Sequence, residues 1–228
     1  MPRDIYAFDV DGTLTSSRGT ISKDMKETLD KFLKNNYCII VTGSDPAKTI
    51  EQIGQDTYDL FKVKFQCCGN HIIHVDGSET IQDLGPVEDM HEYMEIVLSK
   101  SDYPVKAGNH IEYRQGMVNL SFVGCNCTQE QREEYYKWDK ENRQRAMFAE
   151  EFDAMFPEFM AQIGGEISLD IFRKDKDKRQ VRNWYPNDTL HFFGDKCQPG
   201  GNDYSLAQVA DYVYHVSGPE DTLRRLKR

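Results

Sequence analysis

The first third of the chain alternates between short apolar runs and amphipathic stretches. Residues 4–10 (DIYAFDV), 37–41 (YCIIV) and 63–68 (VKFQCC) are runs of strand length, which predict buried strands. Ser22 suits the N-cap of a helix, and apolar side chains follow it at helical spacing, at Met25, Leu29, Phe32 and Leu33. Pro46 suits the first turn of a second helix. This strand–helix–strand order predicts a parallel sheet with right-handed crossovers.

The middle of the chain follows a different pattern. Residues 71–77 end in Asp-Gly, which favours a β-hairpin turn. Residues 112–124 and 166–172 alternate between apolar and polar side chains, as half-buried strands do. Residues 86–100 and 128–156 are predicted to be helical, the second as one long charged stretch. Together these elements predict an α+β unit inside an α/β chain.

The strand–helix rhythm returns in the last quarter of the chain. We expect a helix over 178–184, a buried strand over 189–193 and a helix that opens at 201–203. A last strand over 212–216 precedes a terminal helix that begins at Pro219. The overall fold class is therefore α/β, with a parallel-sheet domain interrupted by an insert.

The predicted domain organisation is discontinuous. Residues 1–81 and 178–228 form the core domain, and residues 82–177 form a cap inserted between its two halves. A chain of 228 residues is long enough for one large domain or two small ones.

Composition narrows the possible partners. The chain has 28 basic and 38 acidic residues and a net charge of -10, so nucleic acid is not expected as a main partner. The longest apolar runs, such as residues 38–41, are far shorter than a membrane span, and no signal peptide is expected before the first strand. Six cysteines favour reduced, buried thiols in a cytoplasmic protein.

Two carboxylates end the first predicted strand, in the segment DVDGTLT at 9–15. Ligands of open α/β sheets bind outside the carboxyl ends of the strands. Asp9 can act there as a nucleophile toward phosphorus, and Asp11 can protonate a leaving oxygen and later deprotonate an acceptor. One Asp-x-Asp pair alone is more often a solvated turn, so the prediction depends on the later segments.

Three later segments supply groups that suit phosphoryl transfer. Ser44 follows the second strand before a helix N-terminus, where a hydroxyl and backbone N–H groups favour phosphate. Lys178 is expected to neutralise the transferring phosphoryl group. The alternative is that the charged segment DKDKR at 175–179, which contains Lys178, is simply exposed to solvent. Asp195 follows another strand and offers a second carboxylate for Mg²⁺, while Asp203 either orients Lys178 or binds a metal-bound water.

These segments, in this order, resemble the haloacid-dehalogenase superfamily, and across nearly the full chain they resemble the eukaryotic-type phosphomannomutase family. The matching segments are FDVDGTLT at 8–15, VTGSD at 41–45, IEYRQGMVNLSFVG at 111–124, GGEISLDIF at 164–172, DKR at 177–179, FFGDKCQPGGND at 192–203 and GPEDT at 218–222. The resemblance implies a Rossmann-like core with a parallel sheet and an inserted α+β cap of the C2b type.

The resemblance also assigns roles to individual residues. It implies that Asp9 is the phosphorylated nucleophile and Asp11 the general acid and base, and that Ser44 and Lys178 belong to the catalytic set. It implies Mg²⁺ on Asp9, on the backbone carbonyl of Asp11 and on Asp195, with Asp203 in the same metal site. The family positions that hold the sugar phosphate correspond to Arg18, Arg114, Arg132, Ser168 and Asp170. The family carries a further cap arginine where this chain has Cys125.

The activity implied by the resemblance is the interconversion of mannose 6-phosphate and mannose 1-phosphate through a hexose 1,6-bisphosphate. It further implies a cytoplasmic homodimer that associates through the cap and serves GDP-mannose biosynthesis. An alternative is a Mg²⁺-dependent sugar-phosphate phosphatase of the same fold. A neutral thiol at Cys125 cannot make the paired, charged hydrogen bonds that an arginine makes to phosphate, and a weakened cap site lets water take the place of the sugar acceptor. A non-catalytic binding protein is disfavoured by the complete set of Asp9, Asp11, Lys178 and Asp195.

Overall fold

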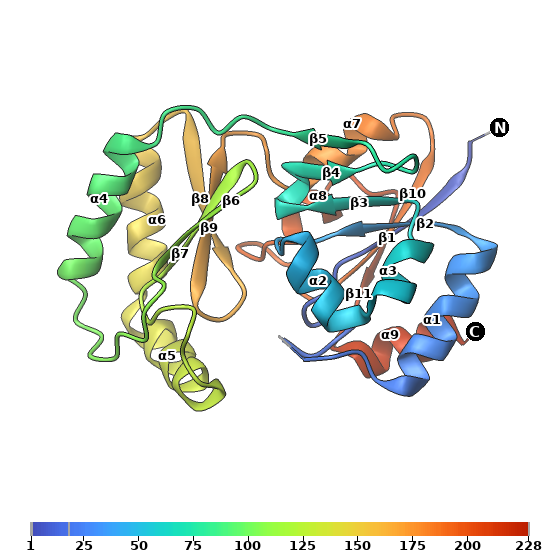
Figure 1. Cartoon of the computed structure of the whole chain (residues 1–228), viewed down its shortest axis with the longest axis horizontal. Coiled ribbons are helices and arrows are strands. Elements are labelled where there is room, and N and C mark those ends of the chain that lie inside the picture. Colours follow the sequence, from blue (N-terminus) through green and yellow to red (C-terminus); the bar gives the residue numbers. More distant parts are fainter. Residues whose placement is uncertain (1, 18, 228) are drawn as a thin grey trace. The chain divides into compact units, whose positions relative to one another are not determined.

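The computed structural model describes residues 2–17 and 19–227, which form two compact units (Figure 1). The first unit comprises residues 1–81 and 175–228, and the second comprises residues 82–174. The chain was expected to return to the first unit at residue 178, whereas Asp175–Asp177 already belong to it. Asp177 is the N-cap of the 3₁₀ helix η2 (Lys178–Gln180), and its side chain accepts a hydrogen bond from the backbone N–H of Arg179 at 2.9 Å.

A seven-stranded sheet forms the centre of the first unit, with strand order β11-β10-β1-β2-β3-β4-β5. The strands are β1 (Asp4–Phe8), β2 (Tyr37–Val41), β3 (Val63–Gln66), β4 (His71–Ile73), β5 (Glu79–Ile81), β10 (Thr189–Gly194) and β11 (Tyr212–His215). Strands β11, β10, β1, β2 and β3 pair in parallel, which confirms the predicted parallel sheet. β4 and β5 extend it as the predicted hairpin, with Gly77 at φ 81° in the turn.

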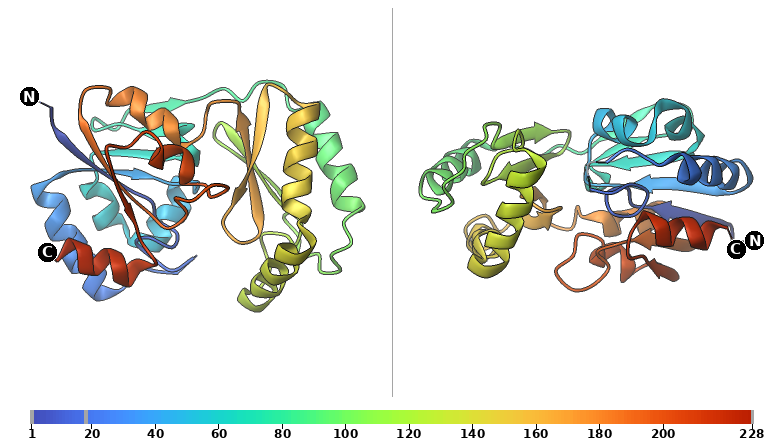
Figure 2. Two further views of the ribbon diagram at one scale, coloured as in Figure 1. Left: turned by 180° about the vertical axis from the view of Figure 1, so that it is seen from behind. Right: turned by 90° about the horizontal axis from the view of Figure 1, so that it is seen from below.

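Helices cover both faces of this sheet (Figure 2). One face packs against α1 (Lys23–Asn35), α2 (Pro46–Ile53), α3 (Gln55–Leu60) and α9 (Pro219–Leu226). The other face packs against α7 (Val181–Trp184) and α8 (Tyr204–Ala207), beside η2 and a second 3₁₀ helix, η1 (Cys67–Gly69). Ser22 caps α1 as expected, since its Oγ accepts from the backbone N–H of Met25 at 3.3 Å. The short helix α3 was not predicted.

The second unit contains a four-stranded antiparallel sheet with strand order β6-β7-β9-β8. The strands are β6 (Ile111–Arg114), β7 (Met117–Ser121), β8 (Phe159–Gly164) and β9 (Ser168–Arg173). Helices α4 (Glu88–Ser99), α5 (Gln129–Asn142) and α6 (Gln144–Met155) contribute to the apolar cluster on one sheet face. β8 was missing from the sequence prediction.

The prediction of one helix over 128–156 was wrong. The helical stretch breaks at Arg143, whose φ of 55° lies in the left-handed region. Asp139 stabilises the break, because its side chain accepts from the backbone N–H of Arg145 at 2.9 Å and pairs with the Arg145 Nε at 2.7 Å. No glycine or proline marks this position, so the sequence gives no ordinary stop signal there.

The sheet of the second unit has one apolar and one polar face. Val118, Leu120, Leu169 and Ile171 belong to the apolar cluster with the helices. Because side chains alternate along a strand, their neighbours in sequence, such as Asn119, point to the opposite face. The opposite face carries Asn119 and, in register with it, Asp170, with Met117 and Phe172 at one end of the same face. We call it the polar face of this sheet.

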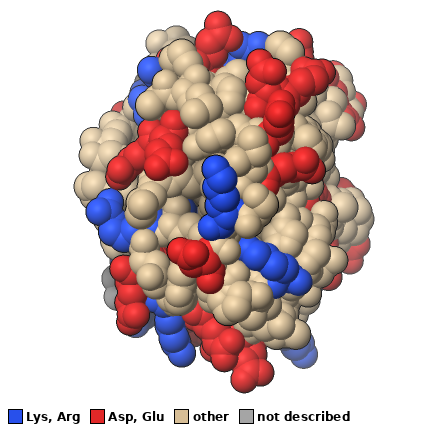
Figure 3. Space-filling model, turned by 90° about the vertical axis from the view of Figure 1, so that its left-hand side faces the viewer, with Lys and Arg blue, Asp and Glu red and all other residues tan. Residues whose placement is uncertain are grey.

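On the face shown in Figure 3, acidic side chains form several groups and basic side chains are scattered between them. The described residues of that face therefore form no continuous basic surface. Each helix in the described part of the chain is too short or too polar to cross a membrane.

Candidate active site

Lys178 joins two carboxylates in the interior of the first unit. Its Nζ donates to Asp9 Oδ1 at 2.8 Å and to Asp203 Oδ1 at 2.6 Å, and the Lys178 side chain is fully buried. Asp9 follows strand β1, and Thr13 Oγ1 donates to the second Asp9 oxygen at 3.3 Å. Asp203 precedes α8, and its second oxygen accepts from the backbone N–H of Lys196 at 3.1 Å. Asp203 therefore contacts Lys178 directly, and its role as an orienting or metal-binding residue stays a prediction.

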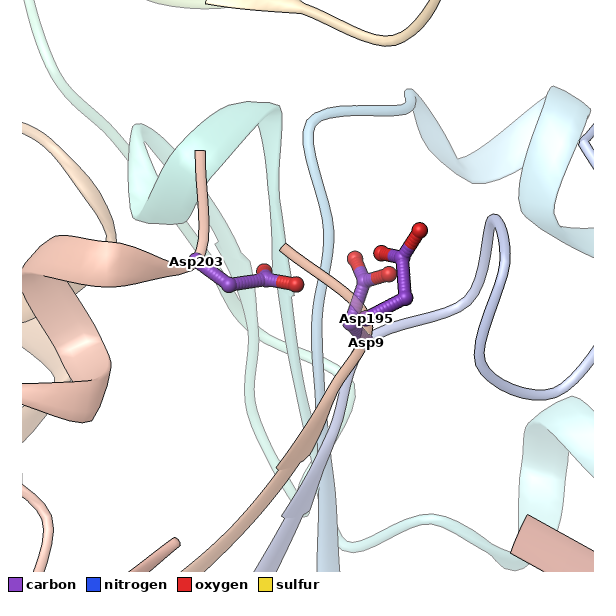
Figure 4. A group of neighbouring side chains, drawn as sticks. All are labelled: Asp9, Asp195 and Asp203. Carbon is purple, nitrogen blue, oxygen red and sulfur yellow. The ribbon is translucent and has the colours of Figure 1, made fainter. Parts of the chain in front are cut away.

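A group of three carboxylates lies at the end of the seven-stranded sheet where β1 and β10 finish (Figure 4). Asp9, Asp195 and Asp203 each offer an oxygen, and these oxygens all lie within 4.8 Å of one another. Gly12 permits the close approach of Asp195, because a Cβ on Gly12 would collide with that carboxylate. Three hard oxygen donors suit Mg²⁺, which prefers carboxylates, waters and phosphate oxygens.

The electrostatics of the carboxylate group favour a cation. Burial, together with the negative charge of Asp203, raises the pKa of Asp9 to about 8. Burial also raises the pKa of Asp195 to about 6, and Asp203 adds to that increase. Burial alone would lower the pKa of Lys178, but Asp203 and Asp9 raise it well above the ordinary value of 10.5. One ammonium therefore does not compensate the negative charge, and a divalent cation would relieve the remaining repulsion.

Asp11 lies outside this carboxylate group and points its side chain toward α2. One oxygen accepts from Ser44 Oγ at 3.3 Å and lies 3.4 Å from Lys48 Nζ. The other oxygen accepts from Gln52 Nε2 at 2.9 Å. Ser44, Lys48 and Gln52 lie four residues apart, so they share one side of the helix start. The sequence prediction included Ser44 but not Lys48 or Gln52. The four-residue spacing from Ser44 through Lys48 to Gln52 is the signal that could have identified them.

The second unit holds the other residues that the resemblance selected. Asp170 and Ser168 lie on β9 and share the polar sheet face, and both are at least partly buried. Asn119 Nδ2 donates to Asp170 Oδ1 at 2.7 Å, and Cys125 Sγ lies 3.6 Å from Asn119 Oδ1. Sequence analysis missed Asn119, although it faces Asp170 across the β7–β9 pair.

Three arginines were expected to hold the sugar phosphate. Arg114 ends β6 and pairs with Glu112 at 2.6 Å, and Arg132 is a buried residue of α5. Arg18 lies outside the described residues. The roles of all three arginines stay predictions.

The fold and the carboxylate group define the class of protein. The structure resembles that of a sugar phosphatase of haloacid-dehalogenase (HAD) subclass IIB, with a TM-score of 0.63, 15% identity and coverage of 98% of each chain. At this identity the likeness establishes a haloacid-dehalogenase fold.

Sequence comparison places the chain within that class. The profile of the eukaryotic phosphomannomutase family matches residues 25–228. A probable phosphomannomutase of Caenorhabditis elegans is 37% identical over 240 residues, which cover 99% of this chain and 94% of the relative. The phosphomannomutase of Saccharomyces cerevisiae is 37% identical over 241 residues, covering 99% and 93%. The chain belongs to the eukaryotic phosphomannomutase family.

Proposed function

We propose that this chain is a phosphomannomutase that interconverts mannose 6-phosphate and mannose 1-phosphate through a hexose 1,6-bisphosphate. The observation that carries the proposal is the buried Asp9–Lys178–Asp203 arrangement in a chain of this family. It presents a carboxylate beside a fixed ammonium at the end of a parallel sheet, as phosphoryl transfer through an aspartyl-phosphate requires.

Asp9 would attack the phosphorus of a bound phosphate ester. A bond forms between a carboxylate oxygen of Asp9 and phosphorus, while the bond from phosphorus to the ester oxygen breaks. Lys178 neutralises charge beside Asp9 and fixes its orientation. Mg²⁺ held by Asp9, Asp195, Asp203 and the backbone carbonyl of Asp11 would neutralise charge on the phosphoryl oxygens.

Asp11 would move the proton in both directions. It gives a proton to the leaving sugar oxygen and takes one from the acceptor hydroxyl of the second step. Ser44, Lys48 and Gln52 hold its side chain in place through the contacts described above. The ester that Asp9 attacks in the first step is the 1,6-bisphosphate, so the departing sugar keeps its other phosphate and leaves as the monophosphate. In the second step phosphorylated Asp9 transfers its group to the free hydroxyl of a mannose 1-phosphate, which forms the bisphosphate again.

The second unit would recognise the hexose phosphate. Arg114 and Arg132 of this unit, together with Arg18 from the first part of the chain, are proposed to bind the phosphate that does not react, because guanidinium groups pair with phosphate in a two-pronged geometry. Ser168 and Asp170 are proposed to bind the sugar. The proposal also includes a homodimer formed through the second unit and a cytoplasmic role in GDP-mannose biosynthesis, as the family resemblance implies.

A sugar-phosphate phosphatase is the second candidate function, and Cys125 favours it. The family arginine at this position would add a charged contact to phosphate, whereas Cys125 is a buried thiol. Loss of a charge-assisted contact costs about 2–4 kcal/mol of binding. A bisphosphate that is held less tightly dissociates more often, and water then hydrolyses the phosphorylated Asp9.

One assay separates the two functions. The enzyme is given mannose 1-phosphate and Mg²⁺, with and without glucose 1,6-bisphosphate, while mannose 6-phosphate and free phosphate are both measured. A mutase forms mannose 6-phosphate in a bisphosphate-dependent reaction with little free phosphate. A phosphatase releases free phosphate in proportion to the substrate consumed, and the absence of both products would refute the proposed function.

A further inference from the structure

Four polar residues form a row across the sheet of the second unit. Glu112 on β6 pairs in register with Asn119 on β7, and Asn119 pairs with Asp170 on β9. Asp170 pairs in turn with Gln162 on β8. Residues paired in this way project to the same face of a sheet, so this row, Glu112–Asn119–Asp170–Gln162, crosses the whole polar face.

The neighbours of Gln162 show which face it occupies. Ala161 and Ile163 pack into the apolar cluster with the helices, so Gln162 points to the opposite face with Asp170. Gly164 follows two residues later on the same face. A Cβ on Gly164 would collide with the Asp170 carboxylate, so the glycine leaves room for Asp170 on this part of the face.

The two amides that flank Asp170 differ in their hydrogen bonds. Asn119 is satisfied on both sides, since its Nδ2 donates to Asp170 and its Oδ1 faces the Cys125 thiol. The Gln162 Oε1 is buried and has no hydrogen-bond partner among the described residues. A buried acceptor without a donor costs free energy, and most such atoms in folded proteins are satisfied.

We propose that Gln162 is a further substrate-binding residue, whose Oε1 accepts a hydrogen bond from a hydroxyl of the hexose ring. This inference rests on the proposed function. Gln162 and Asp170 present acceptors from adjacent strands, which suits two neighbouring ring hydroxyls that both donate. Asn119 acts as a positioning residue, because it fixes the Asp170 carboxylate from the other side.

The first test substitutes the amide by an apolar side chain of similar size, Gln162→Leu. KM for mannose 1-phosphate is expected to rise about tenfold while kcat changes by less than about twofold, because the chemistry at Asp9 is untouched. The melting temperature of the ligand-free variant should equal or exceed that of wild type, since a buried unpartnered oxygen has been removed. Gln129→Leu is the matched control, because Gln129 is exposed on α5 and its side chain donates to Glu133.

The second test identifies the hydroxyl. Binding of mannose 6-phosphate and its 2-deoxy, 3-deoxy and 4-deoxy analogues is measured by calorimetry without added bisphosphate, for wild type and Gln162→Leu. Removing the hydroxyl that Gln162 binds should weaken wild-type binding about tenfold and the variant less than twofold. The other deoxy analogues should weaken both proteins equally.

Four outcomes would overturn the inference. One is equal weakening of both proteins by all three analogues, and another is a KM increase that occurs only with a lower melting temperature. The third is a wild-type protein that neither binds nor isomerises hexose phosphates, which would overturn the proposed function as well. An active wild type with an unchanged Gln162→Leu variant would contradict this inference alone.

Discussion

Lys178 and Asp9 are 169 residues apart in the sequence, yet their side chains meet in a buried ion pair of 2.8 Å. The pair connects the two halves of the first unit, which the second unit separates in sequence. The same ammonium also pairs with Asp203, so its positive charge is shared between two carboxylates. The ion pair is therefore both part of the proposed chemistry and a determinant of stability.

Replacing Lys178 by methionine should destabilise the metal-free protein by about 3–5 kcal/mol, because two buried carboxylates lose their counterion. The measurement is urea unfolding in EDTA at neutral pH, compared with Lys174→Met, which removes a lysine that is exposed. The double variant Lys178→Met, Asp203→Asn should regain part of the lost unfolding free energy, since one of the two uncompensated carboxylate charges is removed. Equal stability of Lys178→Met and wild type would contradict the energetic role of the pair.

Asp9→Asn should lower mutase and phosphatase turnover at least a thousandfold while the protein stays folded. The amide has nearly the same shape as the carboxylate, but it cannot attack phosphorus and it is a weaker metal ligand. Turnover is measured by the assay for mannose 6-phosphate and free phosphate, and the fold by circular dichroism. Turnover within tenfold of wild type would show that Asp9 is not the nucleophile.

Much of this site could be predicted because the carboxyl ends of parallel strands converge. Asp9 lies at the end of its predicted strand, Ser44 and Asp195 follow theirs, and the structure brings all three to one end of the same sheet. Lys178 was harder to choose, since several lysines surround it and only folding buries one of them. The choice of Lys178 depended on the family resemblance, because the pattern of charged residues around it does not distinguish one lysine from another.

Other features left no signal in a single sequence. The left-handed conformation of Arg143 is stabilised by contacts of Asp139 that form only after folding. Strand β8 is a short, weakly alternating segment that ends at two glycines, and its partner β9 determines its register. The importance of Gln162 follows from that register, so it could not be found before β8 was known.

Chelation should abolish activity, and added Mg²⁺ should restore it. The reason is that burial, with repulsion from Asp203 added to it, raises the pKa values of Asp9 and Asp195, so a cation is needed to hold these carboxylates ionised. Mg²⁺ at about 100 times its Kd should also stabilise the fold by about 2.7 kcal/mol. Asp195→Asn is the control, because it should weaken this stabilisation while leaving Lys178 paired. Full activity in excess EDTA would show that no divalent cation is required.

Asp221 should make stability depend on pH at the acidic end. Hydrogen bonds from Arg224 and Arg225 lower the pKa of Asp221 from 3.8 to about 2. Because the folded-state pKa lies below the unfolded value, the stabilisation is complete above about pH 4 and is lost as pH falls toward 2. The melting temperature of Asp221→Asn should therefore lie below that of wild type at pH 6, with the difference shrinking between pH 4 and 2. A difference that is independent of pH would show that the carboxylate charge does not matter.

Cys125→Arg should strengthen hexose-phosphate binding and lower the fraction of turnovers that release free phosphate. Cys125 is buried, and its thiol lies 3.6 Å from the same Asn119 that holds Asp170, so a side chain there adjoins the proposed sugar site. An arginine restores a charged contact that holds the bisphosphate while it reorients, and the gain should appear as a lower KM.

The same substitution should lower stability without ligand, because a guanidinium must be accommodated where a small thiol was buried. We expect a loss of about 1–3 kcal/mol in urea unfolding, which saturating mannose 6-phosphate should partly reverse because the phosphate pairs with the new charge. Cys125→Ser is the control, since it changes the thiol without adding charge and should leave KM within about twofold of wild type. A folded Cys125→Arg variant with unchanged KM and unchanged phosphate release would show that the side chain at this position does not reach the substrate, and the argument for a weakened mutase would then fail.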